Sequence, residues 1–188
     1  MTSSDSRRPW TLLLMAAAFL VMVTLGIRQS FGLFLLPVTE ALGTGREVFS
    51  LALALQNLLW GIASPFAGAL ADKFGAGRVA AIGTLFYAGG LVVMASFVSP
   101  SGLMMGQLMI GIGLGSAGVS IALGAVARAV APEKRSLALG MVTSIGSFGQ
   151  FAVLPVTQIF IDGYGWQVSL LLLSGLSASM LASCLLMA

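Results

Sequence analysis

The chain has 188 residues, of which 58% are hydrophobic and only 8% are charged. Its mean hydropathy of +1.03 is far above that of a water-soluble domain, so the composition predicts a membrane protein. The chain has one cysteine and no histidine, which excludes an internal disulfide and removes the commonest metal ligand and general base. We therefore expect no enzyme, no metal and no cofactor. The net charge is +3, but the basic residues do not form a patch with interleaved aromatic residues, so no nucleic-acid partner is expected.

Uncharged stretches divide the chain into predicted membrane spans. A helix of about 20 residues crosses about 30 Å of hydrocarbon at about 1.5 Å per residue and satisfies its own backbone hydrogen bonds in lipid. The uncharged run 79–127 is too long for one crossing, and Pro100 and Gly102 in "SPSG" predict a turn within it. The sequence thus predicts a cytoplasmic tail, 1–9, and one bundle of six transmembrane helices, 10–188. The predicted spans are 10–36, 48–71, 79–98, 103–130, 136–161 and 166–188.

Lysine and arginine are distributed unevenly between the two sides of the predicted bundle. One side carries seven basic residues, whereas the other carries only Arg46. Because basic loops stay in the cytoplasm, both termini are predicted there, and the bacterial inner membrane is the expected location. The basic side would also contact anionic headgroups of the lipid bilayer. The seven residues are Arg7, Arg8, Lys73, Arg78, Arg128, Lys134 and Arg135.

The stretch "GALADKFGAGR", 68–78, is the most polar segment and lies between the second and third predicted spans. Gly68 falls in the end of the second span, where the missing side chain would allow a neighbouring helix to approach closely. Asp72 is expected at the end of that helix and Arg78 at the start of the next. Gly75 and Gly77 would form the tight turn between them. An ordinary surface loop with solvated charges is the simpler alternative.

This stretch resembles the signature of the major facilitator superfamily of secondary transporters, G-x-x-x-D-[RK]-x-G-R-[RK], at Gly68, Asp72, Lys73 and Gly75. Arg78 comes two residues later than the first arginine of the strictest form. "MIGIGLGSAG" and "APEKRSLALGMVTSIGSFG" also resemble the family's fourth and fifth helices. The resemblance covers the whole chain but only the first half of a twelve-helix transporter, so it implies one six-helix bundle built from two three-helix repeats. It also implies that these five residues form a gate, in which Asp72 and Arg78 help to latch the cytoplasmic side.

Arg28 is a charged residue within the first predicted span. An arginine at the bilayer centre costs about 2.5 to 3.5 kcal/mol on insertion scales and is usually tolerated where it faces a cavity. Snorkelling to the outer headgroups is the alternative, because a long apolar stretch precedes it.

The stretch "RQSFGLFLLP" resembles the first helix of the monocarboxylate and oxalate/formate transporter branch, in which a basic residue before S-F-G faces the translocation pathway. In animal members that residue stands at the position of Gln29, so Arg28 lies one residue earlier, about 100° around the helix. If Arg28 has this role, the resemblance implies a small organic anion as substrate, since a guanidinium can hold a carboxylate with two parallel hydrogen bonds.

Further polar side chains fall inside the predicted spans. Together they could line a wet cavity, whereas any one alone could instead bond to a neighbouring helix. Gln107 stands where many proton-coupled family members have an arginine, and no carboxylate falls inside a span, so no proton relay is expected within this chain. Gly111, Gly115 and Gly118 indicate a small-residue face for helix packing. The predicted substrate-binding residues are Arg28, Gln29, Asn57, Gln107, Ser120 and Gln150.

Together, the residues and the resemblance predict a secondary active transporter of small organic anions, of the monocarboxylate or dicarboxylate type, that works by alternating access. Such a transporter needs a second six-helix bundle, which would be a C-terminal half or a second copy of this chain. Because the sequence ends in the apolar "SCLLMA", we expect a longer protein. A self-associating half-transporter and a non-transporting membrane interaction or scaffold fragment remain as alternatives.

Overall fold

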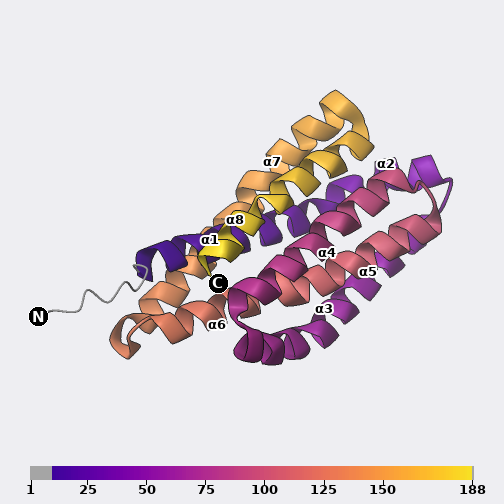
Figure 1. Cartoon of the computed structure of the whole chain (residues 1–188). Helices are drawn as coiled ribbons and strands as arrows, with labels where there is room; N and C mark the ends of the chain where they lie inside the picture. Colours follow the sequence, from indigo (N-terminus) through magenta and orange to yellow (C-terminus); the bar gives the residue numbers. More distant parts are fainter. Residues whose placement is uncertain (1–9, 188) are drawn as a thin grey trace, which may run out of the picture.

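The computed structural model describes residues 10–187, so the predicted tail, 1–9, and the last residue of the sixth predicted span lie outside the described part. Every secondary-structure element in that part is helical, which confirms the predicted all-α class. Figure 1 shows the helices lying together as one elongated bundle. They are α1 (Trp10–Ser30), the 3-10 turn η1 (Phe31–Phe34), α2 (Leu35–Leu42), α3 (Arg46–Phe74), α4 (Ala76–Ser96), α5 (Pro100–Ala117), α6 (Val119–Ala129), α7 (Pro132–Ala178) and α8 (Met180–Leu186).

Five helical segments of the described part are long and apolar enough to cross a membrane, whereas the sequence predicted six spans. The fifth and sixth predicted spans lie in one segment of 55 residues, because α7 is assigned as one helix across the predicted loop between them. Gly165, at φ 80° and ψ 165°, has non-helical angles at the place of that loop. Figure 1 shows α7 turning back on itself at its far end. The segments are Trp10–Leu42, Arg46–Phe74, Ala76–Ser96, Pro100–Ala129 and Pro132–Leu186.

The two arms of α7, on either side of Gly165, pack against different helices. The first arm lies against α1, where a Cβ placed on Gly26 would be only 2.7 Å from the carbonyl oxygen of Gly149. The second arm lies against α4, where Ser174 Oγ donates a hydrogen bond to the carbonyl oxygen of Ala88 at 3.0 Å. Small residues thus let the first arm approach α1 closely, as is common between membrane helices.

The glycines of α5 bring this helix into close contact with α3. A Cβ placed on Gly111 would be 2.6 Å from the carbonyl oxygen of Gln56, and one placed on Gly115 would be 2.7 Å from Ala63 Cβ. The predicted small-residue face is therefore confirmed at these two glycines. Gly118 does not share this face, because it separates α5 from α6. A Cβ placed on Gly118 would be nearest to the backbone of Leu114 in α5 and not to another helix.

α3 lies at the edge of the described bundle. In the most apolar 18 residues of α3 only 17% of the residues are buried, against 61% in the corresponding stretch of the segment formed by α5 and α6. Large exposed side chains recur every four residues along it, so one apolar face of α3 is left uncovered by the described chain. These side chains are Leu58, Ile62, Phe66, Leu70 and Phe74.

Two very short turns connect the middle helices. Gly75 alone separates α3 from α4, with a φ of 93° that favours glycine. The prediction that Gly77 shares this turn is wrong, because Gly77 is buried in the first turn of α4, where helical hydrogen bonding continues. A break near the predicted "SPSG" turn is confirmed, since Ser99 Oγ accepts a hydrogen bond from Gly102 N at 3.0 Å and Pro100 begins α5. Gly102, however, lies in the first turn of α5 and not in the connection.

Candidate functional site

Arg28 lies in the last turn of α1, and its guanidinium is held by α3. Its Nη2 donates to Asn57 Oδ1 at 2.8 Å, and its Cζ lies 4.8 Å from the ring centroid of Trp60, within cation–π range. Asn57 Nδ2 in turn donates to the carbonyl oxygen of Leu53 at 2.8 Å, which directs the amide oxygen toward Arg28. Arg28 is half-buried and has no carboxylate partner among residues 10–187. The described chain therefore holds a positive charge without neutralising it.

Trp60 was expected among the polar residues inside the second span, but it is not one of the predicted substrate-binding residues. It follows Asn57 by three residues, so both side chains lie on the same face of α3 and meet the same guanidinium. That spacing, opposite an arginine in the preceding span, is the sequence signal that could have identified it.

Gln29 and Gln150 line one cavity between α1, η1 and the first arm of α7. Its volume is about 640 Å³, and Phe151 and Pro155 contribute apolar walls. A mainly apolar cavity with a few polar groups is typical of a small-molecule site. The full lining is Gln29, Leu33, Ser147, Gln150, Phe151, Leu154, Pro155 and Gln158.

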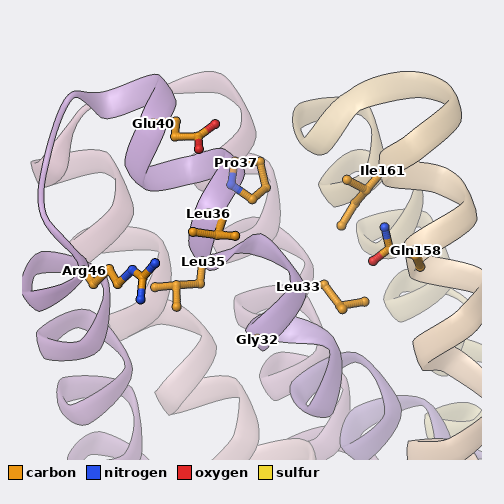
Figure 2. A pocket seen from close by; sticks show the side chains of 9 residues that line it. All are labelled: Gly32, Leu33, Leu35, Leu36, Pro37, Glu40, Arg46, Gln158 and Ile161. Carbon is orange, nitrogen blue, oxygen red and sulfur yellow. The ribbon is translucent and has the colours of Figure 1, made fainter.

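A second cavity, of about 610 Å³, opens where η1 and α2 meet α3 and the far end of the first arm of α7. Figure 2 shows Gln158 and Ile161 of α7 facing Leu33 and Pro37 across it, with Arg46 near α2 on the other side. Leu33 and Gln158 line both cavities, so the two form one groove along the seam between the first helical segment and α7. Arg46 lines one of the two cavities and Gln29, the residue after Arg28, lines the other, whereas Arg28 itself lines neither.

Of the six predicted substrate-binding residues, only Gln29 and Gln150 line these cavities. Gln107 is fully buried in α5, and both polar atoms of its amide lack a hydrogen-bond partner in the described part of the chain. Ser120 is exposed in the first turn of α6. The other four predicted residues form two pairs, one joining α1 to α3 and one lining the cavity against α7.

The predicted gate residues lie at the end of the bundle where α3 meets α4. Arg128, in the last turn of α6, places Nη1 3.0 Å from Asp72 Oδ1 and forms an ion pair with it. The sequence reasoning missed this partner, because a count of charges does not report distances between helices. Arg78 is exposed in the first turn of α4 and forms no ion pair among the described residues. Lys73 Nζ lies 5.3 Å from the ring centroid of Phe74.

Gly68 does not have the neighbour that the sequence predicted. A Cβ placed there would meet no heavy atom within 4 Å in the described chain, so no helix of this bundle approaches it closely. The reason is that α3 is an edge helix and Gly68 lies among its exposed residues. Beside it, Asp72, Gly75 and Arg128 contribute to a cavity of about 360 Å³.

The ion pair between Asp72 and Arg128 should add little to the stability of the fold. The two side chains are 68% and 54% exposed, and exposed pairs contribute about 0 to 1 kcal/mol. We expect the free energy of unfolding in detergent to stay within about 1 kcal/mol of the parent value for Asp72→Asn, Arg128→Met and the double variant. A coupling energy well above that range would show that the pair is a structural clamp. Glu133→Gln, which alters an exposed carboxylate outside the pair, is the matched control.

Known proteins with similar sequences are membrane transporters. Residues 8–188 match the family model of the Major Facilitator Superfamily. The chain is 31% identical over 176 residues to monocarboxylate transporter 11 of Mus musculus, which covers 89% of this chain and 38% of that protein. It is 27% identical over 180 residues to monocarboxylate transporter 13 of Rattus norvegicus, with coverages of 91% and 40%. It is 33% identical over 105 residues to the putative niacin/nicotinamide transporter NiaP of Bacillus subtilis, with coverages of 56% and 26%.

Among solved structures, the POT family transporter PepTSo has a similar fold, with a TM-score of 0.75 and 17% identity over 96% of this chain and 37% of that one. The chain spans less than half the length of each of these relatives. The family and the curated relatives are transporters and not enzymes. The chain therefore belongs to the Major Facilitator Superfamily of multi-pass membrane transporters and resembles its monocarboxylate branch.

Proposed function

We propose that the chain is the N-terminal half of a secondary active transporter for small organic anions of the monocarboxylate or dicarboxylate type. The observation that carries this proposal is Arg28, a half-buried guanidinium in the first membrane helix without an acidic partner in residues 10–187. Arginine stays charged and can bind a carboxylate through two parallel hydrogen bonds. Because Nη2 already donates to Asn57, the remaining N–H groups are the donors for the anion.

The chemistry of the relatives supports the same class of substrate. Two of them are named as monocarboxylate transporters, and niacin, in the name of a third, is itself a carboxylic acid. The groove beside α7 offers cavities of about 610 and 640 Å³, a size typical of small-molecule sites. Gln29 and Gln150 would bind the polar substituents of the anion and Phe151 its apolar part.

Alternating access would use two contacts that hold α3. In the first contact, Arg28 of α1 donates a hydrogen bond to Asn57 of α3. In the second contact, near the C-terminal end of α3, Arg128 of α6 forms an ion pair with Asp72. An anion bound to the remaining N–H groups of Arg28 would draw the guanidinium away from Asn57 and so weaken the first contact. The second contact, with Gly68, Lys73, Gly75 and Arg78 around it, would latch the cytoplasmic side and release as the helices rock.

The proposed topology has six crossings, with both termini in the cytoplasm. The break at Gly165 supports it, because the two arms of α7 pack against different helices. In a Cys184→Ser background, Ser101→Cys and Tyr164→Cys should react with a membrane-impermeant maleimide on intact cells. Lys134→Cys should react only after permeabilisation. Protection of Tyr164→Cys under both conditions would contradict the sixth crossing.

The uncovered apolar face of α3 supports a second six-helix bundle as the partner, with substrate held between the two. The relatives are more than twice as long as this chain, which favours a C-terminal half as that bundle. A second copy of the chain, forming a self-associating half-transporter, is the alternative, and a non-transporting scaffold fragment is the third reading.

Uptake by reconstituted protein tests the function. The chain, alone and together with the C-terminal remainder of its protein, would be placed in liposomes and offered labelled small carboxylates and matched uncharged amides. We expect saturable uptake of carboxylates only when the second bundle is present. Uptake by the chain alone, together with a dimer in crosslinking, would instead support the self-associating form. No saturable uptake from the complete, folded protein would contradict the proposal.

A further inference from the structure

Two fully buried glutamines, Gln56 of α3 and Gln107 of α5, have amide atoms without a hydrogen-bond partner in the described chain. The side chains are 1% and 0% exposed. The atoms concerned are Nε2 of Gln56 and both Nε2 and Oε1 of Gln107. Unpaired polar groups in an apolar interior are costly, so native proteins pair nearly all of them with protein atoms or ordered water. Three such atoms in two packed helices therefore indicate a ligand.

Both glutamines lie on the surfaces where α3 and α5 touch. Gly111 packs against the backbone of Gln56 and Gly115 packs against Ala63, so the two helices run parallel in this contact. Gln107 precedes Gly111 by one turn, which places it on the same face of α5, toward α3.

The two glutamines lie about one helical turn apart along this interface. Side chains of a helix lean toward its N-terminus, so Gln56, which is level with Gly111, extends toward the turn of α5 that carries Gln107. On the same face of α3, the residue one turn before Gln56 is Ala52, which is buried and small. The methyl group of Ala52 occupies little of the interface beside Gln56.

We propose that Gln56 and Gln107 together bind ordered water in the interface of α3 and α5, and that this water sets the position of Asn57 beside Arg28. The two amides supply donors and an acceptor, which matches the two to four partners of a buried water. Gln56 directly precedes Asn57, so a shift of α3 on α5 moves the acceptor that holds Arg28. Gln107 is thus a positioning residue that acts through α3 and does not touch the anion. The effect on transport rests on the proposed function, whereas the hydration does not.

Thermal unfolding of Gln56→Met, Gln107→Met and the double variant of the full chain tests the shared site. If water joins the two amides, each single variant leaves the other amide poorly paired and lowers Tm by about 3 to 8 °C. The double variant removes both amides, so its Tm should be close to that of the parent. The effects of the two substitutions on Tm would then be strongly non-additive. Additive effects of the two substitutions, in either direction, would overturn the proposal, because the amides would then be independent. Gln29→Met, an exposed amide, controls for the change of residue type.

Selective labelling with ¹⁵N-glutamine gives a direct readout. The side-chain amide signals of Gln56 and Gln107, assigned from the two variants, should show cross-relaxation with long-lived water at low temperature. Lack of any water contact at both amides would overturn the hydration site. For the complete transporter, Gln107→Met should raise KM for carboxylates several-fold while Vmax is kept, and an unchanged KM would overturn the positioning role. If the parent protein transports no carboxylate, the proposed function fails, but the unfolding and labelling results still decide the hydration site.

Discussion

Arg28→Ala is expected to lower Vmax/KM for carboxylate uptake at least about 100-fold in liposomes that contain the complete transporter. The substitution removes two charge-assisted hydrogen bonds to the anion, each worth about 1.5 to 3 kcal/mol. The fold should not suffer, because a half-buried charge without an acidic partner in the described chain is removed. Initial uptake rates over a range of carboxylate concentrations, with Tm recorded on the same preparation, measure both effects.

Two variants separate the role of Arg28 from a general loss of positive charge. Arg28→Lys keeps the charge but loses the planar pair of donors, so it should retain part of the uptake, with Vmax/KM about 10-fold below the parent. Arg135→Ala removes an exposed basic residue near the start of α7 and should transport as the parent does. Parent-like KM and Vmax in Arg28→Ala would show that the anion binds elsewhere.

Gly149→Leu is expected to have the largest effect on stability, with a loss of about 3 kcal/mol or a failure to accumulate in the membrane. A Cβ on Gly149 would overlap the carbonyl oxygen of Met22 in α1, and backbone atoms cannot move aside as a flexible side chain can. A Cβ on Gly26 would likewise be 2.7 Å from the Gly149 carbonyl oxygen, so α1 and α7 must separate along this contact. Tm in detergent and the amount of folded protein in membranes measure the loss.

Gly140→Leu is the matched control for this substitution. Gly140 lies on the same arm of α7, but a Cβ there would meet no heavy atom within 4 Å in the described chain. The same change in size and helix propensity should therefore leave Tm within a few degrees of the parent. Similar losses in both variants would show that helix propensity, and not the close packing of α1 and α7, explains the result.

The fold was predictable where single residues control the backbone locally. Pro100 and the cap at Ser99 divide a long apolar run as expected, because ring geometry and capping act over a few residues. Gly77 was assigned to a turn that Gly75 makes alone, since two nearby glycines are equally permissive and only packing decides between them. The charge of Asp162 predicted the division between the fifth and sixth spans, and the structure has non-helical backbone angles three residues later, at Gly165, within α7.

The candidate site was predictable where a residue is anomalous in its own segment. Arg28 is conspicuous as a charge in an apolar run, and Asn57 as an amide in the next span. The partners across helices were not predictable, because rotation and register between helices depend on packing over many residues. Asp72 therefore pairs with the unforeseen Arg128. Gln107 was expected at a cavity but is sealed between two helices, as the polarity of a residue does not report its burial.

The junction at Gly75 limits how α3 can move. With one residue between them, the end of α3 has almost no slack by which to separate from α4, since neighbouring Cα atoms are about 3.8 Å apart. At its other end, α3 is reached through residues 43–45, two of which are glycines. Because this junction keeps one end of α3 close to α4, a swing of α3 about Gly75 would displace its residues more the farther they lie from Gly75. A displacement that is barely measurable at Asp72 would be several times larger at Arg46, at the mouth of the groove.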